Sequence, residues 1–426
     1  MRYVIDGSAG CIAPLALSPI DFEIRTITDD EVPGWCGALN TGFLNASGDV
    51  DAEVRRPGLF LDRTWAAFAG EAIVATLRTF PTLLTVPGGE SVKASAVTAV
   101  TTTATYRRQG LATRLIHAEL AATVERGEAM SILIAAAWGI YGRFGYGAAT
   151  EHQTWTVDAS VATLRQVPQG SVELVDRDTA RAVVAAVYDV HRRGHPGEMT
   201  RPERFWDVDL GILRYPSWTE PKAGFHVVAR DRDGSVVGVA RYEYEEKWEH
   251  RIGRSQVKVT MFVSSGPAGD ALLWRHLVSI DHIAQVQVED RGPDELVPWL
   301  LTDARHAQPT DRADFLWIRP LDVAQVLAAR TYLVSGRIVL EVVDPSGFCG
   351  GRYELEGGPD GALCRPSDAS PDLTLDISAL SSIYLGGYRV RRLAAAGRID
   401  EHASGAVATA DAMFRSPVAP WCSTWF

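Results

Sequence analysis

The part of this sequence best suited to bind a charged ligand is a short basic turn between a strand and a helix. A β-branched run predicts a strand at 96–103, and an apolar stripe at helical spacing begins at Leu111. Arg107, Arg108 and Gly110 lie between them. Free N–H groups at a helix N-terminus bind phosphate, a glycine lets the backbone approach it closely, and arginine matches its geometry. The turn is therefore predicted to hold a phosphate group, with an ordinary turn carrying two solvated arginines as the alternative.

A glycine-rich aromatic segment follows the next predicted strand, at 131–136. Residues 138–147 contain four glycines among tryptophan, tyrosine and phenylalanine. This composition predicts a tight, packed loop rather than a helix or a strand. Most of its rings are expected to lie in a core. Tyr141, just after the strand, is the candidate for chemistry.

Length, charge and cysteine content limit the kind of protein this is. With 426 residues the chain has room for about two to four domains, each with its own core. A net charge of −11 argues against nucleic acid as a partner and favours cationic small molecules. Five scattered cysteines without a Cys-x-x-Cys pair fit a reducing cytoplasm and argue against a zinc site or a disulfide framework. No signal peptide or membrane-spanning run is recognisable, so we expect a cytoplasmic protein without a membrane partner.

The order of predicted elements occurs twice in the chain. A helix capped at Thr28–Glu31, a hairpin at 64–79, the strand at 96–103, the basic turn and its helix form the first copy. From about 158 to 305 the same order recurs, with elements at 179–193, around Asp233-Gly234, and at 256–262, 268–280 and 284–288. The joint at 263–268 lacks the pattern of arginine, glycine and alanine found after 106. We interpret the second copy as degenerate, without the phosphate site.

The chain changes character from about residue 325, where the pattern indicates a small α+β domain. Its predicted strands are at 338–343, 352–356 and 373–377, and its amphipathic stretches are at 380–384 and 389–396. The tail from Met413 to Phe426 is aromatic and contains two prolines. Because chain termini are usually polar and loose, this tail is expected to dock on another part of the protein.

Together these features resemble the Eis (enhanced intracellular survival) family of bacterial N-acetyltransferases, over the chain from Phe22 to Phe426. The resemblance is carried by Val100–Leu111, Ile140–Gly147, Ser382–Gly386 and the aromatic tail. It implies an α+β fold class with two tandem domains of the GNAT (Gcn5-related N-acetyltransferase) fold, the second degenerate, and a sterol-carrier-protein-like domain. The three domains would span 1–157, 158–324 and 325–426.

The resemblance also implies acetyl-CoA as co-substrate and no metal. Arg107-x-x-Gly110-x-Ala112 is similar to the pattern that holds the coenzyme's pyrophosphate in GNAT enzymes. Tyr141 is expected to face the coenzyme's sulfur, and the terminal carboxylate of Phe426 is expected to reach the same active site. The residues expected to bind the coenzyme are Val100, Thr102, Arg107, Arg108, Gly110, Leu111, Ala112 and Thr113.

These groups suit direct acetyl transfer. Backbone N–H groups near Val100 and Thr102 can bind the acetyl carbonyl as negative charge develops on it. Tyr141, with an ordinary pKa of about 10, can protonate the leaving thiolate. The carboxylate of Phe426 can accept the proton that the amine substrate loses. Simple packing of the tail is the alternative.

The family resemblance implies a homohexamer that acetylates amines of aminoglycosides and other polyamine-like, cationic substrates. Three residues depart from the family pattern. Gln109 stands where a third arginine is frequent, Ala104 where a proline is, and Trp425 at a position that is acidic in some aminoglycoside-acetylating members. The last departure bears on substrate choice, because an acid there would help to hold a cationic sugar.

Other interpretations stay open. The same acetyl transfer could serve a protein lysine, a peptide or an intermediate of antibiotic biosynthesis, and an inactive scaffold or lipid-binding protein is a third possibility. His191 and His195 have helical spacing for a metal site but no obvious carboxylate partner. Cys422 is a candidate nucleophile, but no histidine lies near it in the sequence. The acidic residues from Glu243 to Glu249 form either a solvated face or the rim of a channel for a cationic substrate.

Overall fold

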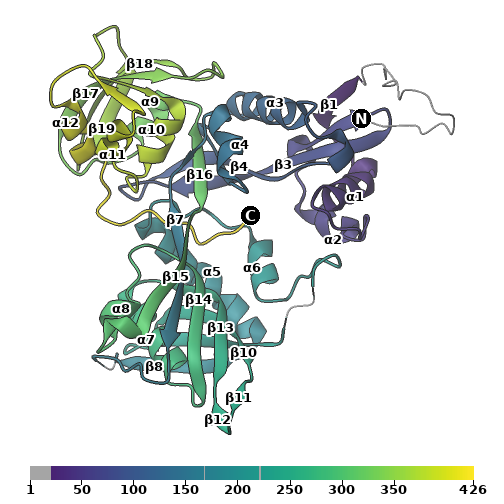
Figure 1. Ribbon diagram of the computed structural model, residues 1–426, viewed down its shortest axis with the longest axis vertical. Helices are drawn as coiled ribbons and strands as arrows, with labels where there is room; N and C mark the ends of the chain where they lie inside the picture. The colour runs from purple at the N-terminus through teal and green to yellow at the C-terminus, as the bar shows by residue number, and fades with distance from the viewer. Residues whose placement is uncertain (1–20, 167, 220–221) are drawn as a thin grey trace, which may run out of the picture. The chain divides into compact units, whose positions relative to one another are not determined.

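The computed structural model describes residues 21–166, 168–219 and 222–426 (Figure 1). These form two compact units. The smaller comprises the described residues up to Arg78 together with 99–118, and the larger comprises the described residues of 79–98 and 119–426. Strands β3 and β4 and helix α3 belong partly to each unit; they span Ala72–Thr85, Ser91–Thr102 and Leu111–Glu125.

In the smaller unit, antiparallel strands support a helix. β2 pairs with β1 on one side and with the start of β3 on the other. The predicted capping box is confirmed, because the Glu31 carboxylate accepts a hydrogen bond from the Thr28 N–H at 2.9 Å. Trp35 on α1 is buried against Phe68 of β2. The elements are β1 (Phe22–Thr26), α1 (Val32–Gly42), α2 (Ala52–Arg55) and β2 (Thr64–Ala69).

In the larger unit, the first part of β4 is parallel to β5 (Met130–Ile134). Next to β5 lies β16 (Leu316–Pro320), which pairs antiparallel with both β5 and β6 (Gly147–Ala148). The single helical turn α4 (Trp138–Tyr141) lies between β5 and β6 in the chain. The end of the predicted second domain thus returns to the sheet of the first.

The second sheet has the strand order β15-β7-β14-β13-β10-β9-β8. Helices α5 and α7 cover opposite faces, since alternate residues of β9 belong to different cores: Val227 packs with α7 and Val228 with α5. The predicted strand–helix–strand unit at 256–288 is confirmed, with β13 and β14 parallel around α7. The strands are β7 (Glu151–Asp158), β8 (Gly170–Val175), β9 (Gly224–Asp231), β10 (Val236–Glu245), β13 (Ser255–Ser264), β14 (Ile283–Arg291) and β15 (Ala307–Asp314), with the two-residue strands β11 (Trp248–Glu249) and β12 (Ile252–Gly253). The helices are α5 (Arg177–Gly194), α6 (Glu203–Asp209), α7 (Pro267–Val278) and α8 (Val297–Leu300).

Two strands depart from a simple division of the chain at residues 157 and 324. All of β7 except Asp158 falls within the predicted first domain, but the strand pairs with β14 and β15 of the second sheet. β16 falls within the predicted second domain but pairs with β5 and β6. The sheets therefore exchange strands, although the domain ranges themselves stay predictions.

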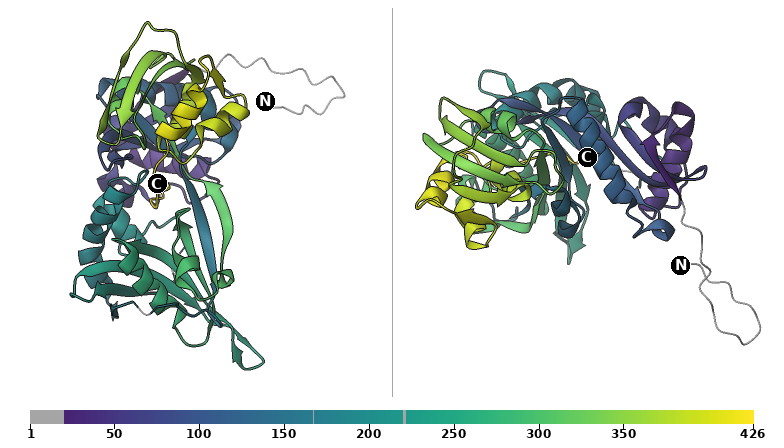
Figure 2. Two further views of the ribbon diagram at one scale, coloured as in Figure 1. Left: turned by 90° about the vertical axis from the view of Figure 1, so that its left-hand side faces the viewer. Right: turned by 90° about the horizontal axis from the view of Figure 1, so that it is seen from above.

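The C-terminal part forms the predicted α+β domain, drawn in light green and yellow in Figure 2. Its sheet has the order β19-β18-β17-β20-β21. The sequence pattern missed β19, β21, α9 and α12. The strands are β17 (Gly336–Val343), β18 (Gly351–Gly358), β19 (Gly361–Pro366), β20 (Leu373–Asp376) and β21 (Ile399–Glu401), and the helices are α9 (Val323–Ala328), α10 (Ile377–Tyr384), α11 (Val390–Ala395) and α12 (Ala406–Met413).

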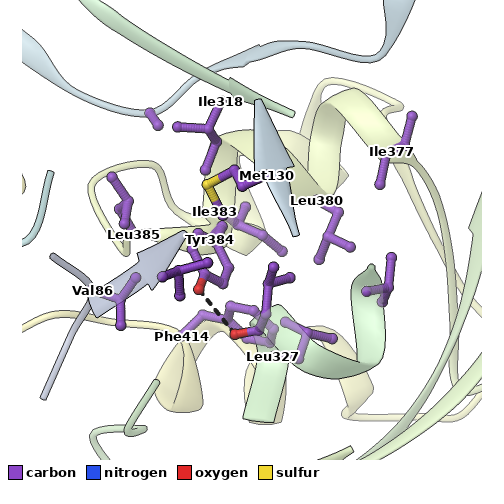
Figure 3. Close-up of a cluster of buried hydrophobic side chains, with 14 of the residues drawn as sticks. Val86, Met130, Ile318, Leu327, Ile377, Leu380, Ile383, Tyr384, Leu385 and Phe414 are labelled. Carbon is purple, nitrogen blue, oxygen red and sulfur yellow. Dashed lines mark hydrogen bonds between the residues drawn. The ribbon is translucent and has the colours of Figure 1, made fainter. Parts of the chain in front are cut away.

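One hydrophobic core joins this domain to the strands of the first sheet that lie in the larger unit. Figure 3 shows Leu380 and Ile383 of α10 with Met130 of β5 and Ile318 of β16 in one cluster. All four side chains are buried. The C-terminal domain therefore supports the strands that carry the Tyr141 loop. Among the described helices, none combines the length and the apolar character needed to cross a membrane.

Candidate functional site

The basic turn has the geometry that the sequence predicts for an anion site. Arg107, Arg108 and Gly110 are exposed, and Gly110 has a φ of +77° in the left-handed region. A side-chain atom added at Gly110 would meet no protein atom within 4 Å, so the backbone there faces open space. The Gly110 carbonyl accepts a hydrogen bond from the Arg114 N–H at 3.0 Å, which starts α3 directly at the turn. Leu111 is buried and holds the first turn of the helix in place.

Just before the turn, β4 carries a local irregularity. Ala99 has a φ of +56°, which is unusual for a residue with a side chain. The Thr76 hydroxyl stabilises it by donating to the Ala99 carbonyl at 2.8 Å and contacting the Thr101 hydroxyl at 2.9 Å. Val100 and Thr102, the predicted binders of the acetyl carbonyl, flank Thr101 and are half-buried. Such distortions bend a strand and redirect its backbone groups.

Tyr141 lies in the larger unit at the end of α4. Here the sequence prediction was wrong in one respect, because residues 138–144 form a helical turn and a 3₁₀ turn rather than an irregular loop. The Tyr141 ring is 7% exposed and lies edge-on to Tyr146, with ring centroids 6.0 Å apart. Burial raises the pKa of Tyr141 above its ordinary value. The hydroxyl therefore keeps its proton at neutral pH, as a general acid must.

Buried polar groups hold this loop from outside. Arg319 on β16 donates from Nε to the Phe144 carbonyl at 2.8 Å, and the Ser381 hydroxyl on α10 donates to the Gly145 carbonyl at 3.1 Å. Arg319 also donates from Nη2 to both carboxylate oxygens of Asp344, at 2.9 and 2.8 Å, and both side chains are fully buried. Burial by itself would raise the pKa of Asp344, but the Arg319 guanidinium and nearby backbone N–H groups hold it below its ordinary value.

Sequence reasoning missed Arg319 and Asp344. The available signal was an arginine inside an otherwise apolar strand, Leu316–Pro320. Arginine is almost never fully buried unless it is paired. Such a position therefore indicates a buried acid elsewhere in the fold, but not which one.

The C-terminal tail docks on the larger unit, as the sequence predicts. Thr424 is buried, and the Trp425 ring lies 5.5 Å from that of Phe315 although Trp425 itself is 65% exposed. The Phe426 ring is edge-on to Phe80 of β3, with centroids 5.6 Å apart. Tyr141 and Phe426 thus have separate ring contacts, with Tyr146 and Phe80, and the chemical roles expected of them stay predictions.

Two other candidate sites have structural explanations. Cys422 is fully buried, which raises the pKa of its thiol well above the ordinary value, so it stays protonated. His191 does have a carboxylate neighbour, contrary to the sequence interpretation, since its Nε2 lies 3.3 Å from Glu198. The rings of His191 and His195 are stacked 3.9 Å apart. Within the described residues, no group of three potential metal ligands comes together.

The acidic cluster lies beside a polar cleft of about 580 Å³ at one end of the second sheet. Glu245 and Glu249 line this cleft, but so do Lys247 and Arg254. The Lys247 ammonium lies 2.9 Å from Glu249. The local charge is therefore mixed, which favours the solvated-face interpretation over an acidic substrate channel.

Comparison with known proteins supports this architecture along the chain. Protein-family models described as acetyltransferase (GNAT) domain match residues 23–149 and 197–320. A family model described as sterol carrier protein domain matches residues 323–423. The second GNAT match includes the copy that lacks the basic turn. An inactive scaffold is thereby disfavoured, since named N-acetyltransferases share the whole arrangement.

Relatives match over nearly their whole length. An uncharacterized N-acetyltransferase of Streptomyces avermitilis is 42% identical, over 96% of this chain and 99% of its own. N-acetyltransferase Eis of Mycobacterium tuberculosis is 32% identical, over 92% of this chain and 96% of its own. The crystal structure of Eis1 from Mycobacterium abscessus is 28% identical, with a TM-score of 0.83 over 95% of this chain and 100% of that one. With two GNAT domains, a sterol-carrier-like domain and this degree of identity, the chain belongs to the Eis family of N-acetyltransferases.

Proposed function

We propose that this N-acetyltransferase takes its acetyl group from acetyl-CoA bound at the turn 107–113 and transfers it directly to a cationic amine of the aminoglycoside or polyamine class. The observation that carries the proposal is the turn itself. Its backbone at Gly110 faces open space, two exposed arginines precede it, and a helix starts there. These features fit a pyrophosphate.

The reacting groups of the proposal are those that the sequence predicts. Acetyl-CoA supplies an activated acetyl thioester. Arg107 and Arg108 would neutralise the phosphates, and N–H groups near Val100 and Thr102 would bind the acetyl oxygen. Tyr141 would give its phenolic proton to the leaving thiolate, and the carboxylate of Phe426 would take a proton from the attacking amine.

Replacing Gly110 by valine is expected to raise the dissociation constant of acetyl-CoA by at least about tenfold. A β-branched residue is strained at a φ of +77° and places methyl groups where the phosphates approach. Isothermal titration of the purified enzyme measures both affinity and stoichiometry, and one coenzyme per chain is expected. Gly234 is a matched control, because it too has positive φ (+83°) and open surroundings, but lies in the hairpin between β9 and β10. A Gly234→Val variant that loses binding equally, or two sites per chain, would contradict the assignment.

The net charge of −11 predicts that long-range attraction helps a polycationic substrate to bind. KM for a multiply charged aminoglycoside should therefore rise as salt is increased from low to physiological strength, because screening shortens the reach of the protein's field. Steady-state thiol release at several salt concentrations tests this, with a neutral monoamine as the comparison. If KM is independent of salt, or neutral monoamines are preferred, acetylation of a protein lysine, a peptide or a biosynthetic amine becomes the better proposal. The homohexamer, the cytoplasmic location and the absence of metal, nucleic-acid and membrane partners stay predictions.

A further inference from the structure

The second GNAT domain repeats the strand–helix–strand arrangement of the first. β13 and β14 are parallel and joined through α7, as β4 and β5 are joined through α3. The ladder between β13 and β14 ends at the pair Val259 and Val288. Beyond this pair lie the ends of the two strands, close to the first turn of α7.

A buried arginine lies at these strand ends. Arg291, at the end of β14, forms ion pairs with Asp270 in the first turn of α7, at 2.9 Å, and with Glu295. The guanidinium lies 4.2 Å from the ring centroid of Phe262 on β13. One side chain of this domain thus ties the end of β14 to β13 and to the first turn of α7.

The C-terminal tail also packs against Arg291. The ring of Trp421 lies 5.2 Å from the Arg291 guanidinium, within cation–π distance. Its Nε1 donates to the Asp290 carbonyl at 3.0 Å. Gly292 is needed for this fit, because a side chain there would come within 2.9 Å of the Trp421 ring. Trp421 is 6% exposed, so the tail is anchored by a buried residue.

A second anchor lies two residues further along. The fully buried Glu198 carboxylate accepts hydrogen bonds from the Ser423 N–H at 3.1 Å and from the Tyr188 hydroxyl at 2.9 Å. The same hydroxyl contacts the Thr424 side chain at 3.2 Å. These anchors lie just before Trp425 and Phe426 in the chain.

The segment 196–200, which contains Glu198, is also hydrogen-bonded to β3. The Gly197 N–H donates to the Thr85 carbonyl and the Thr200 N–H to the Leu83 carbonyl, at 2.9 and 3.0 Å. On the other side, the Trp421 N–H donates to the Pro196 carbonyl at 2.8 Å. The segment 196–200 therefore fixes the tail relative to the strand on which Phe426 packs.

We propose that the degenerate GNAT domain has become a socket for the C-terminal tail, formed by Phe262, Arg291, Gly292 and Glu198, and that this tail socket positions the α-carboxylate of Phe426 for catalysis. The inference rests on the proposed role of that carboxylate. From Trp421 to Phe426 the extended chain spans roughly 17 Å, so a tail released at Trp421 would let the terminus move over a comparable distance. Misplacing a reacting group by even about 1 Å can lower a rate about 100-fold. Trp421, Arg291 and Glu198 are accordingly positioning residues.

Trp421→Ala tests the proposal with a readout that does not depend on activity. In the full-length enzyme, carboxypeptidase should release Phe426 and Trp425 at least about tenfold faster from this variant than from the wild type, as followed by mass spectrometry. Trp421→Phe should restore most of the protection, because it keeps a ring beside Arg291 and loses only the bond to Asp290. Trp155→Ala is the control, since Trp155 is similarly buried (7% exposed) in the core of the same domain but does not belong to the socket. If carboxypeptidase digests the tail of Trp421→Ala at the wild-type rate, Trp421 does not anchor the tail and the proposed socket is wrong.

Catalysis is measured on the same variants, at a temperature below their unfolding transitions. Trp421→Ala should lower kcat about 10- to 100-fold with an unchanged KM for acetyl-CoA, whereas Trp155→Ala should leave both nearly unchanged.

An enzyme with an amidated C-terminus separates the proposed socket from the proposed role of the carboxylate. If Trp421 acts by placing the carboxylate, Trp421→Ala should cause little further loss in the amidated enzyme. Equal losses in both backgrounds would overturn the positioning role. Full activity of the amidated enzyme would instead remove the role of the carboxylate, while the digestion result still decides whether the socket holds the tail.

Discussion

Replacing Tyr141 by phenylalanine is expected to lower kcat by about 10²–10⁴-fold, the usual contribution of a general acid. Coenzyme affinity and thermal stability should stay nearly unchanged, because the ring that packs edge-on to Tyr146 is retained. Thiol release at saturating amine measures kcat, and titration calorimetry measures acetyl-CoA binding. Unchanged turnover would show that Tyr141 serves packing alone.

Tyr146→Phe provides the matched control. Tyr146 is fully buried and its hydroxyl bonds to the Ser131 hydroxyl at 2.7 Å, so its loss removes a structural hydrogen bond of about 1 kcal/mol rather than a proton donor. The pH dependence gives a second check. Because burial raises the pKa of Tyr141, kcat should not fall through its deprotonation until the pH exceeds the ordinary value of about 10. A fall in kcat just above neutral pH would point to a different general acid.

Replacing Asp344 by asparagine is expected to lower the free energy of unfolding by about 3–5 kcal/mol, because it leaves the Arg319 guanidinium buried without its counter-charge. Chemical denaturation followed by tryptophan fluorescence measures the loss. Arg319 also holds the Phe144 carbonyl, so the variant should loosen the loop that carries Tyr141. Glu341→Gln is the control. Glu341 lies on β17, three residues before Asp344, in a partly exposed pair with Arg352, and such pairs contribute at most about 1 kcal/mol.

The contribution of Asp344 should also depend on pH in a definite direction. Its pKa is lower in the folded protein than in the unfolded chain, so its stabilising effect is present above the unfolded value of about 3.9 and is lost as the pH falls through the folded value. The difference in stability between wild type and Asp344→Asn should therefore be constant near neutral pH and shrink below about pH 4. A variant as stable as Glu341→Gln at pH 7 would contradict the role of the buried pair.

The predicted anion site depends on local rules, which is why it was visible in the sequence. A glycine that needs positive φ, two arginines and the first apolar residue of a helix lie within a few positions of one another. The structure gives Gly110 a φ of +77° and starts α3 at Leu111, as the pattern predicts. The second copy of the fold was readable for the same reason, since each element has its own periodicity.

Strand partners were not readable in this way. β7 and β16 are ordinary strands by composition, and only pairing shows that each belongs to the sheet of the other domain. The choice of neighbour depends on which faces are buried when the whole sheet forms, and a strand's own residues do not encode it. A division of the chain into consecutive ranges therefore could not show the exchange.

By itself, then, the sequence determined the basic turn, its absence from the second copy, and an aromatic tail that must dock. Only the tertiary structure decided where the tail docks and what holds the Tyr141 loop. The contact between Trp421 and Asp290 joins residues 131 apart in the chain, and that between Arg319 and Phe144 joins residues 175 apart. Both contacts join a buried polar group to a partner on a distant element. A buried polar group needs a hydrogen-bond partner, but this requirement does not specify which residue supplies it. Packing of the elements within the larger unit makes that choice.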